Sequence, residues 1–313
     1  MHEETFCTLQ TIHAPNFAPV SLKDRDWMRE IFAKENSRSS DWCFSNIFNW
    51  NELNCHRLVA QLRDRLGLML QYKGECFFGY PIGSGPLEPA VDALAAIAKA
   101  HDVPLRLRGL TVEHVQALET AYPGKFSFST DENTADYVYP LEKIATLAGK
   151  KLSAKRNHIN RFFDNFPNWQ FESIDQSNIA DCVEMNEDWM VQHAGSIDFS
   201  LEKIALGRAF AHFDKLGLEG GLLRVDGAVA AYTIGEVLCD DTYIVHFEKA
   251  FGDMQGAYPL INREFARYIW DKHPHMQYVN REDDLGLDHL RRAKRSYYPE
   301  FMVEKYIALE IQQ

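Results

Sequence analysis

Residues 242–270 read TYIVHFEKA, FGDMQG and AYPLINREFARYIW, and they are the strongest indication of fold in the chain. β-Branched and aromatic residues fill Tyr243–Phe247 without glycine or proline, as in a buried strand. Gly252 and Gly256 bracket a loop, and Pro259 suits the first turn of a helix whose apolar residues recur at helical spacing. Such a turn directs backbone N–H groups and the positive end of a helix at one point. The loop therefore predicts an anion site, typically for phosphate, and a loop that only turns the chain is the alternative.

The segments on either side give an α/β fold with a mixed sheet, in the order β-α-α-β-β-β-α-β-α-β. This order resembles the GNAT acyltransferase fold, and the glycine loop falls where that fold binds the pyrophosphate of acyl-CoA. The expected strands are Trp169–Ile174, Gly220–Arg224, Ala228–Val237, Thr242–Glu248, Gln277–Asn280 and Met302–Leu309, and the expected helices are Ser177–Gln192, Leu201–Leu216, Ala257–Trp270 and Leu285–Tyr298.

The N-terminal half repeats this order, with its own glycine-rich loop at residues 81–86. The recurrence predicts two tandem GNAT-like domains, and a chance recurrence of α and β elements is the alternative. The expected divisions are an N-terminal arm (1–20), a first GNAT-like domain (21–135), a connecting basic segment (136–167) and a second GNAT-like domain (168–313).

Composition limits the function classes. The 313 residues are 46% hydrophobic and 25% charged, as in soluble globular proteins. A net charge of −12 argues against general nucleic-acid binding. The six cysteines lack paired spacing, which fits a reducing compartment, and neither a signal peptide nor an apolar run long enough to span a membrane is evident. These features predict a cytoplasmic protein.

Four longer motifs narrow the resemblance. They are DYVY (136–139), LAGKKLSAKRNHIN (147–160), NREDDLG (280–286) and LRRAKRSYYP (290–299). They are similar to an uncharacterised bacterial family related to the phosphatidylglycerol lysyltransferase C-terminal domain, a tandem GNAT arrangement. The lysyltransferase moves lysine from lysyl-tRNA to a lipid headgroup, and related enzymes aminoacylate peptidoglycan precursors. The resemblance implies an acyl-CoA or aminoacyl-tRNA co-substrate and no tightly bound cofactor. The membrane-spanning part of the lysyltransferase is not found in this chain, so we expect that the acceptor need not be a lipid.

Acyl transfer needs a base for the attacking atom and an acid for the leaving group. Glu248 and His246 share a face of the predicted strand if side chains alternate, and Glu248 is the first choice as base because GNAT enzymes often place a glutamate there. Tyr297, at a helix end, is the candidate acid, with Tyr298 as the alternative. A structural hydrogen bond beside the sheet explains the strand pair equally well.

Charged residues near these positions predict the binding groups. Acidic residues and Arg281 follow a predicted strand, where open α/β sheets have their sites. The simpler explanation of the basic residues in 149–161 is a solvated helix face, and that of Asp283 and Asp284 is an acidic first turn of a helix. The donor-binding candidates are Gln255, Gly256, Ala257, Lys294 and Arg291, and the candidates for an acceptor or anion cleft are Lys151, Lys155, Arg156, His158, Arg281 and Asp283.

Metal chemistry finds little support, because His273 and His275 flank a proline without a further ligand at metal spacing. The sequence predicts an acyl- or aminoacyl-transferase that moves its group from acyl-CoA or aminoacyl-tRNA to an amine or hydroxyl acceptor in the cleft between the domains. The alternative is a non-catalytic binding or sensor protein for a nucleotide-containing or small anionic ligand.

Overall fold

Two seven-stranded mixed sheets form the framework of the computed structural model, which describes residues 16–53, 55–72, 75–193 and 200–311. Most of the predicted arm, residues 1–15, lies outside the described residues. The remainder includes a short strand, β1 (Ala18–Pro19), which pairs with the first sheet. The chain divides into unit 1, residues 1–35, 41–131 and 304–313, and unit 2, residues 36–40 and 132–303.

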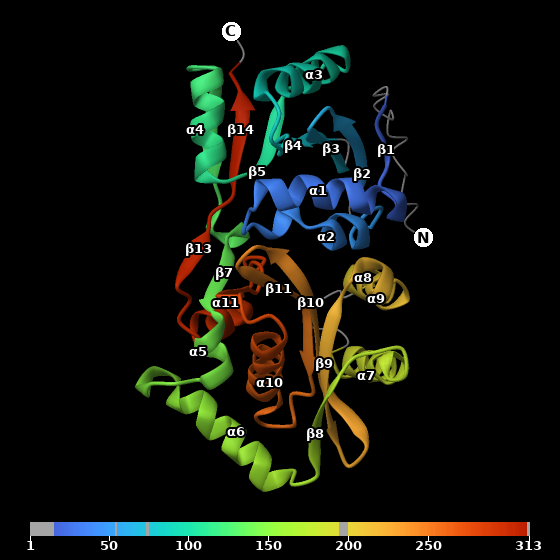
Figure 1. The fold of residues 1–313 in the computed structure, drawn as a ribbon, viewed down its shortest axis with the longest axis vertical. Coiled ribbons are helices and arrows are strands. Elements are labelled where there is room, and N and C mark those ends of the chain that lie inside the picture. Colours follow the sequence, from blue (N-terminus) through green and yellow to red (C-terminus); the bar gives the residue numbers. More distant parts are fainter. Residues whose placement is uncertain (1–15, 54, 73–74, 194–199, 312–313) are drawn as a thin grey trace, which may run out of the picture. The chain divides into compact units, whose positions relative to one another are not determined.

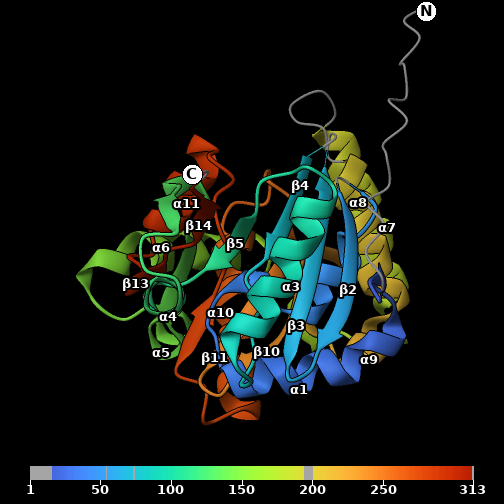
Figure 2. The same ribbon diagram turned by 90° about the horizontal axis from the view of Figure 1, so that it is seen from above.

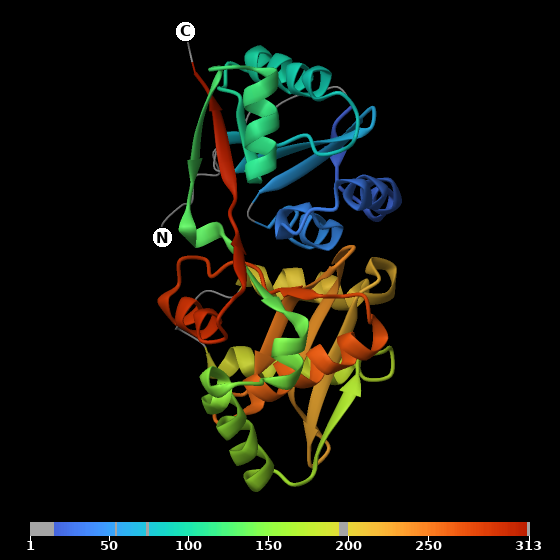
Figure 3. The ribbon, with the colours of Figure 1, turned by 60° about the vertical axis from the view of Figure 1, so that its left-hand side comes forward.

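Unit 1 contains the sheet β1-β2-β3-β4-β5-β14-β6, in which β4 and β5 are parallel. Figure 2 shows helix α3 packed over strand β3 of this sheet, and Figure 3 shows β14, in red, beside α4 in green. The strands are β2 (His56–Leu62), β3 (Arg65–Tyr72), β4 (Glu75–Gly79), β5 (Arg106–Leu110), β6 (Phe126–Thr130) and β14 (Tyr306–Glu310), and the helices are α1 (Arg25–Glu35), α2 (Phe44–Asn49), α3 (Leu87–Ala100) and α4 (Val112–Ala121).

Unit 2 contains the sheet β13-β7-β12-β11-β10-β9-β8, in which β11 and β12 are parallel. Helix α10 lies on one side of this sheet and α7 and α8 on the other (Figure 1). The strands are β7 (Asp136–Pro140), β8 (Trp169–Ser173), β9 (Glu219–Val225), β10 (Ala228–Cys239), β11 (Thr242–Ala250), β12 (Tyr278–Asn280) and β13 (Phe301–Val303), and the helices are α5 (Leu141–Thr146), α6 (Ser153–Asn165), α7 (Ile179–Gln192), α8 (Ser200–Ala211), α9 (Phe213–Leu216), α10 (Ala257–Lys272) and α11 (Asp288–Arg295).

The two sheets match position by position, which confirms the predicted tandem GNAT-like fold. Counted from β1 in unit 1 and from β8 in unit 2, each sheet begins with an antiparallel run of four strands, continues with one parallel pair, and ends with two antiparallel strands. The sixth position comes from a distant part of the chain in both units. It is β14 in unit 1 and β7 in unit 2.

The predicted strand Met302–Leu309 is wrong in detail, because two strands in two sheets replace it. β13 ends at Val303 opposite Asp136, and β14 begins at Tyr306 opposite Leu110. In addition, residues 136–140 form the second strand from the edge of the unit 2 sheet, although the sequence predicted only a connecting segment there. Pairing partners this far apart in sequence decide both cases, and local pattern does not reveal them.

Apolar side chains of β11, α5, α6 and α10 pack together in unit 2. Tyr243, Leu260 and Ile261 are fully buried there, and Tyr243 meets Phe265 edge to face at 5.7 Å between ring centroids. At about 25 cal/mol per Å² of apolar area, this burial is the main force that fixes α10 against β11. The loop between β11 and α10 is thereby fixed at both ends.

Candidate functional site

The two parallel strands of unit 2 diverge at their carboxyl ends. β11 pairs with β12 only through Thr242–Ile244, and β11 then continues to Ala250 alongside β10. After β12 the chain turns into the segment Arg281–Asp284. Crevices at the carboxyl ends of diverging parallel strands are the usual place for sites in open α/β sheets. The side chains that reach into this gap are therefore the candidate site.

A β-bulge at His246 changes which residues of β11 share a face. Phe247 pairs with Ile234 and Val245 pairs with Gly235, so His246 is the extra residue. Val245 and Glu248 consequently line the same cavity, in contrast to strict alternation. The inference that His246 and Glu248 point to the same face is wrong for this reason.

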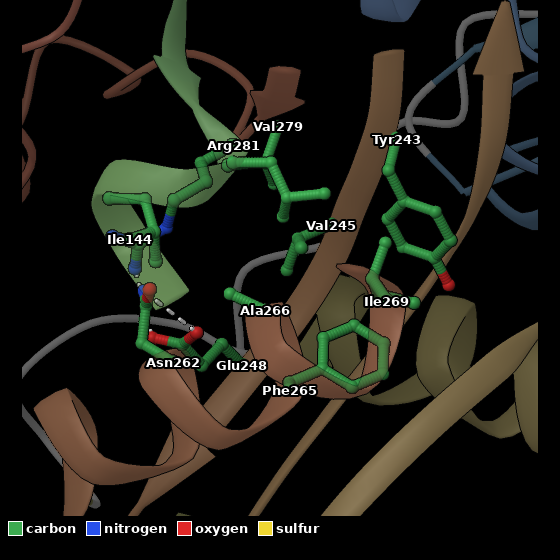
Figure 4. Close-up of a pocket in the computed structure, with 11 residues that line it drawn as sticks. Ile144, Tyr243, Val245, Glu248, Asn262, Phe265, Ala266, Ile269, Val279 and Arg281 are labelled. Carbon is green, nitrogen blue, oxygen red and sulfur yellow. Dashed lines mark hydrogen bonds and ion pairs between the residues drawn. The ribbon is translucent and has the colours of Figure 1, made fainter. Parts of the chain in front are cut away.

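Glu248 lies at the centre of the site, bound through both carboxylate oxygens (Figure 4). Its Oε1 accepts a hydrogen bond from Arg281 Nη2 at 2.9 Å, and its Oε2 accepts one from Asn262 Nδ2 at 3.2 Å. The two side chains of the ion pair are only 12% and 14% exposed. Because a charge-assisted bond in a partly dry site is stronger than one in water, the pair holds the Glu248 carboxylate in one orientation.

A buried nitrogen of the Arg281 guanidinium, Nη1, is left without a hydrogen-bond partner among the described residues. Burial acts to lower the pKa of Arg281, but Glu248, Tyr139 and Tyr297 together outweigh it, and the pKa lies above the ordinary value. An unmet buried donor on a charged group is costly, so this atom indicates a place for an acceptor that is not part of the chain.

A small cavity adjoins the ion pair. Glu248, Asn262 and Arg281 line one part of it, and apolar side chains of β11, α5 and α10 line the rest. Its volume of about 10 Å³ suffices for about one water molecule. A larger ligand therefore has to meet Glu248 and Arg281 from outside this cavity.

Tyr297, two residues after the end of α11, and Lys155 of α6 approach Arg281. The Arg281 Cζ atom lies 5.2 Å from the Tyr297 ring centroid, and the Lys155 Nζ lies 4.1 Å from the same centroid. Tyr297 is 5% exposed, and its hydroxyl makes no hydrogen bond within the part of the chain that the structure describes. Burial raises the pKa of Tyr297 above its ordinary value. Burial, and then the Arg281 charge, lower the pKa of Lys155.

The His246 ring lies between two carboxylates. Its Nδ1 is 2.9 Å from Glu282 Oε1 and its Nε2 is 3.2 Å from Glu236 Oε1. His246 therefore joins β10 to the segment after β12, and its predicted role as second-choice base remains a prediction. Glu236 is 3% exposed and was missed from the sequence. A lone carboxylate inside the apolar run of β10 was the available signal.

The remaining predicted groups of the 280–295 region stabilise the chain itself. Lys294 Nζ donates to the backbone carbonyls of Arg281, at 2.6 Å, and Asp283. Arg291 Nε donates to Asp284 Oδ2 at 2.9 Å. Burial lowers the pKa of Lys294 to about 8, while the Arg291 guanidinium brings the pKa of Asp284 to about 2. Lys294 thus fixes the backbone that carries Arg281, and donor binding by Lys294 and Arg291 remains a prediction.

The predicted donor loop is closely packed against α6. Gly256 has φ = 99°, and a Cβ atom there would lie 2.2 Å from the His158 carbonyl oxygen. The Gln255 Nε2 atom is 3.4 Å from His158 Nδ1. The N–H groups of Gln255 and Ala257 donate within the loop, to Asp253 and Met254. The glycine is required for backbone approach, so a bulky side chain at Gly256 would disturb the fold before it affected any ligand.

The basic segment separates into different roles. Lys155 turns toward Arg281, whereas Arg156 Nη1 donates to the carbonyls of Leu147 and Gly149. The Lys151 Nζ lies 5.2 Å from the Tyr298 ring centroid. Of this segment, Lys155 is the residue that the structure brings to the candidate site.

The corresponding glycine loop of unit 1 is filled by its own side chains. Gly83 N donates to the Glu35 carboxylate at 2.9 Å, and Arg65 donates to the carbonyls of Pro81 and Gly85 at 2.6 and 2.7 Å. Glu35 occupies the position that an anion would take at such a loop. The candidate site is therefore the one in unit 2.

Comparison with known proteins agrees with these features. The family described as "Phosphatidylglycerol lysyltransferase, C-terminal" matches residues 32–309. A conserved protein of unknown function from Bacteroides thetaiotaomicron is 34% identical with a TM-score of 0.88, over 96% of this chain and 100% of that one. The C-terminal domain of a putative lysylphosphatidylglycerol synthetase from Agrobacterium fabrum is 12% identical with a TM-score of 0.64, over 93% and 92% of the two chains, and this similarity shows the fold alone.

One curated protein also matches. It is an uncharacterised protein of Mycoplasmoides gallisepticum, 25% identical over 193 residues, which are 56% of this chain and 56% of that protein. The match thus spans just over half of the relative's length. Across the described helices, none has both the length and the apolar character needed to cross a membrane.

Proposed function

Because the chain belongs to the phosphatidylglycerol lysyltransferase C-terminal family, we propose that it transfers an acyl or aminoacyl group from acyl-CoA or aminoacyl-tRNA to an amine or hydroxyl acceptor. The observation that carries this proposal is the Glu248 carboxylate, held by Arg281 where two parallel strands diverge. A carboxylate fixed at that place is suited to take a proton from an attacking atom.

Each group has a defined part in the proposed reaction. The acceptor nitrogen or oxygen attacks the donor carbonyl carbon and gives its proton to Glu248. The leaving oxygen or sulfur departs with the electron pair of the broken bond and takes a proton from the Tyr297 hydroxyl. Arg281 orients Glu248 and places positive charge beside the oxyanion that forms on the carbonyl.

The Tyr297 environment favours an ester donor over a thioester. Burial raises the pKa of Tyr297, so the group retains its proton until a strongly basic leaving atom develops. A ribose alkoxide is such an atom, whereas a thiolate with a pKa of about 8.5 leaves without needing this proton. The raised pKa of Tyr297 therefore supports aminoacyl-tRNA as the donor.

A donor panel tests the proposal. The purified chain is incubated with labelled aminoacyl-tRNAs or acyl-CoAs and a mixture of amines and alcohols, and products are identified by mass spectrometry. The expected result is product from at least one aminoacyl-tRNA that depends on the protein. Absence of product from both donor classes, with the donors shown to be intact, contradicts it.

The second candidate function is a binding protein without chemistry, such as a sensor for a small anionic ligand. The observation that favours it is that both Glu248 oxygens are already bonded, as in a structural ion pair. Ligand binding without turnover in the donor panel would support it.

The cytoplasm is our proposed location, because the five cysteines among the described residues are all free thiols.

A further inference from the structure

The charges at the candidate site do not balance. Arg281 and Lys155 approach the same Tyr297 ring, and Glu248 is the carboxylate that acts on both of their pKa values. Glu248 is bonded to Arg281 Nη2. The Lys155 ammonium lies over the Tyr297 ring and has no hydrogen-bond acceptor among the described residues. Two cations thus face one carboxylate in a partly buried place.

An anion would correct this imbalance. The buried Arg281 Nη1 lacks an acceptor, and the Lys155 ammonium has three N–H donors to offer. Burial and the Arg281 charge already lower the pKa of Lys155, which is the cost of placing a second cation here without a counter-ion. A group with one negative charge and two acceptor oxygens suits both cations, because it can place one oxygen in the water-sized cavity that Arg281 lines while the rest of the ligand stays outside this cavity.

The site also offers a negative group. The Glu248 carboxylate lies within reach of the same ligand, because Arg281 bonds to it directly at 2.9 Å. A ligand that fits both halves carries an amine for Glu248 and an anionic group for Arg281 and Lys155. We propose that the acceptor is an amine that carries its own carboxylate, that is, an amino acid.

This inference rests on the proposed function, since it assigns the acceptor of the same reaction. The free amine of the amino acid attacks the donor carbonyl, the new C–N bond forms as the donor ester C–O bond breaks, and Glu248 receives the proton from nitrogen. The leaving oxygen takes the Tyr297 proton. Arg281 and Lys155 bind the carboxylate, and so place the nitrogen beside Glu248 throughout.

Binding by isothermal titration calorimetry, without any donor, tests the inference on the full chain. The probes are glycine, L-alanine, methylamine, acetate and inorganic phosphate. The expected result is that an amino acid binds at least about tenfold more tightly than methylamine or acetate, since each of these satisfies half of the site. Equal or tighter binding of acetate, methylamine or phosphate overturns the inference.

Two variants give a matched comparison. Lys155→Met is expected to weaken amino-acid binding by about tenfold or more, while Lys151→Met, which removes a lysine of the same segment that contacts Tyr298, is expected to leave it within about twofold. Equal affinity of the Lys155→Met variant and the parent overturns the inference. Should Lys155→Met fail to fold, the probe series on the parent still decides.

The calorimetry tests the amino-acid site and the donor panel tests the transferase, so the two proposals can be contradicted independently. A parent that binds amino acids but yields no product contradicts the transferase and keeps the binding site. A parent that transfers its group to simple amines or alcohols, and does not bind amino acids, keeps the transferase and removes the inference.

Discussion

Gly256→Ala should destabilise unit 2 through a backbone contact between the donor loop and α6. The new Cβ atom would lie 2.2 Å from the His158 carbonyl oxygen and 2.9 Å from Phe162 Cβ. The backbone there has φ = 99°, which L side chains adopt with strain. We expect the free energy of unfolding to fall by about 1–2 kcal/mol because of the left-handed backbone and by about 1–3 kcal/mol because of the steric overlap.

Taking about 3 kcal/mol as the central value, the loss corresponds to a fall in Tm of about 6–12 °C for a unit of this size. Thermal and urea unfolding, followed by circular dichroism, measure it. The matched control is Gly252→Ala in the same loop, where no atom lies within 4 Å of the added Cβ. The control should stay within about 1 kcal/mol of the parent.

A Gly256→Ala variant as stable as the Gly252→Ala control would refute the contact between this loop and α6. It would also weaken the placement of Lys155, because α6 carries Lys155 one turn before His158. A large loss of stability combined with unchanged ligand affinity would show that the loop supports the fold and does not form the binding site.

Three further predictions concern the groups around Arg281. Asp284→Asn should remove part of the loss of folding stability at acid pH. The pKa of Asp284 is about 2 in the folded chain and near 4 in the unfolded chain, so its contribution to stability is present above about pH 4 and is lost as pH falls toward 2. Urea unfolding of parent and variant at several pH values measures this contribution. Lys294→Met should remove a rise in folding stability between about pH 8 and 10.5, because a lysine with a pKa lowered to about 8 binds fewer protons in the folded than in the unfolded chain. The same unfolding series at alkaline pH measures this, and a parallel rise in both proteins would contradict it. Tyr297→Phe should cost at most about 1 kcal/mol of stability, since the hydroxyl has no hydrogen-bond partner among the described residues, yet it should slow transfer from an ester donor by about tenfold or more; unchanged single-turnover rates would exclude the acid role.

Local pattern was sufficient for much of the fold. The strand Tyr243–Phe247, its glycine loop and the helix after it lie where periodicity placed them, because each signal is contained in a short stretch. The place of β7 in the sheet of unit 2 and that of β14 in the sheet of unit 1 were not predictable in this way. Their partners lie more than 100 residues away, as with Val138 and Asn280, or Leu110 and Tyr306, and only the tertiary fold brings them together.

In the candidate site, too, some features were predictable from local sequence and others depend on strand pairing. Glu248, Arg281, Lys155 and Tyr297 were all predicted as site residues, and the structure brings them together. The role of Glu236 was missed because the His246 bulge depends on the register between β10 and β11. For the same reason, alternation along one strand gave the wrong face for His246. Register across a sheet is set by pairing and not by the residues of a single strand.

The rate of single-turnover transfer by Glu248→Gln tests the central claim most directly. The amide keeps the size of the side chain and can still bond to Arg281 through its oxygen, but it cannot accept the proton of the acceptor. With donor and acceptor saturating, the rate should fall by about 10²–10⁴-fold relative to the parent, with donor affinity unchanged. A variant that transfers its group within about twofold of the parent rate would contradict the assignment of Glu248 as the base.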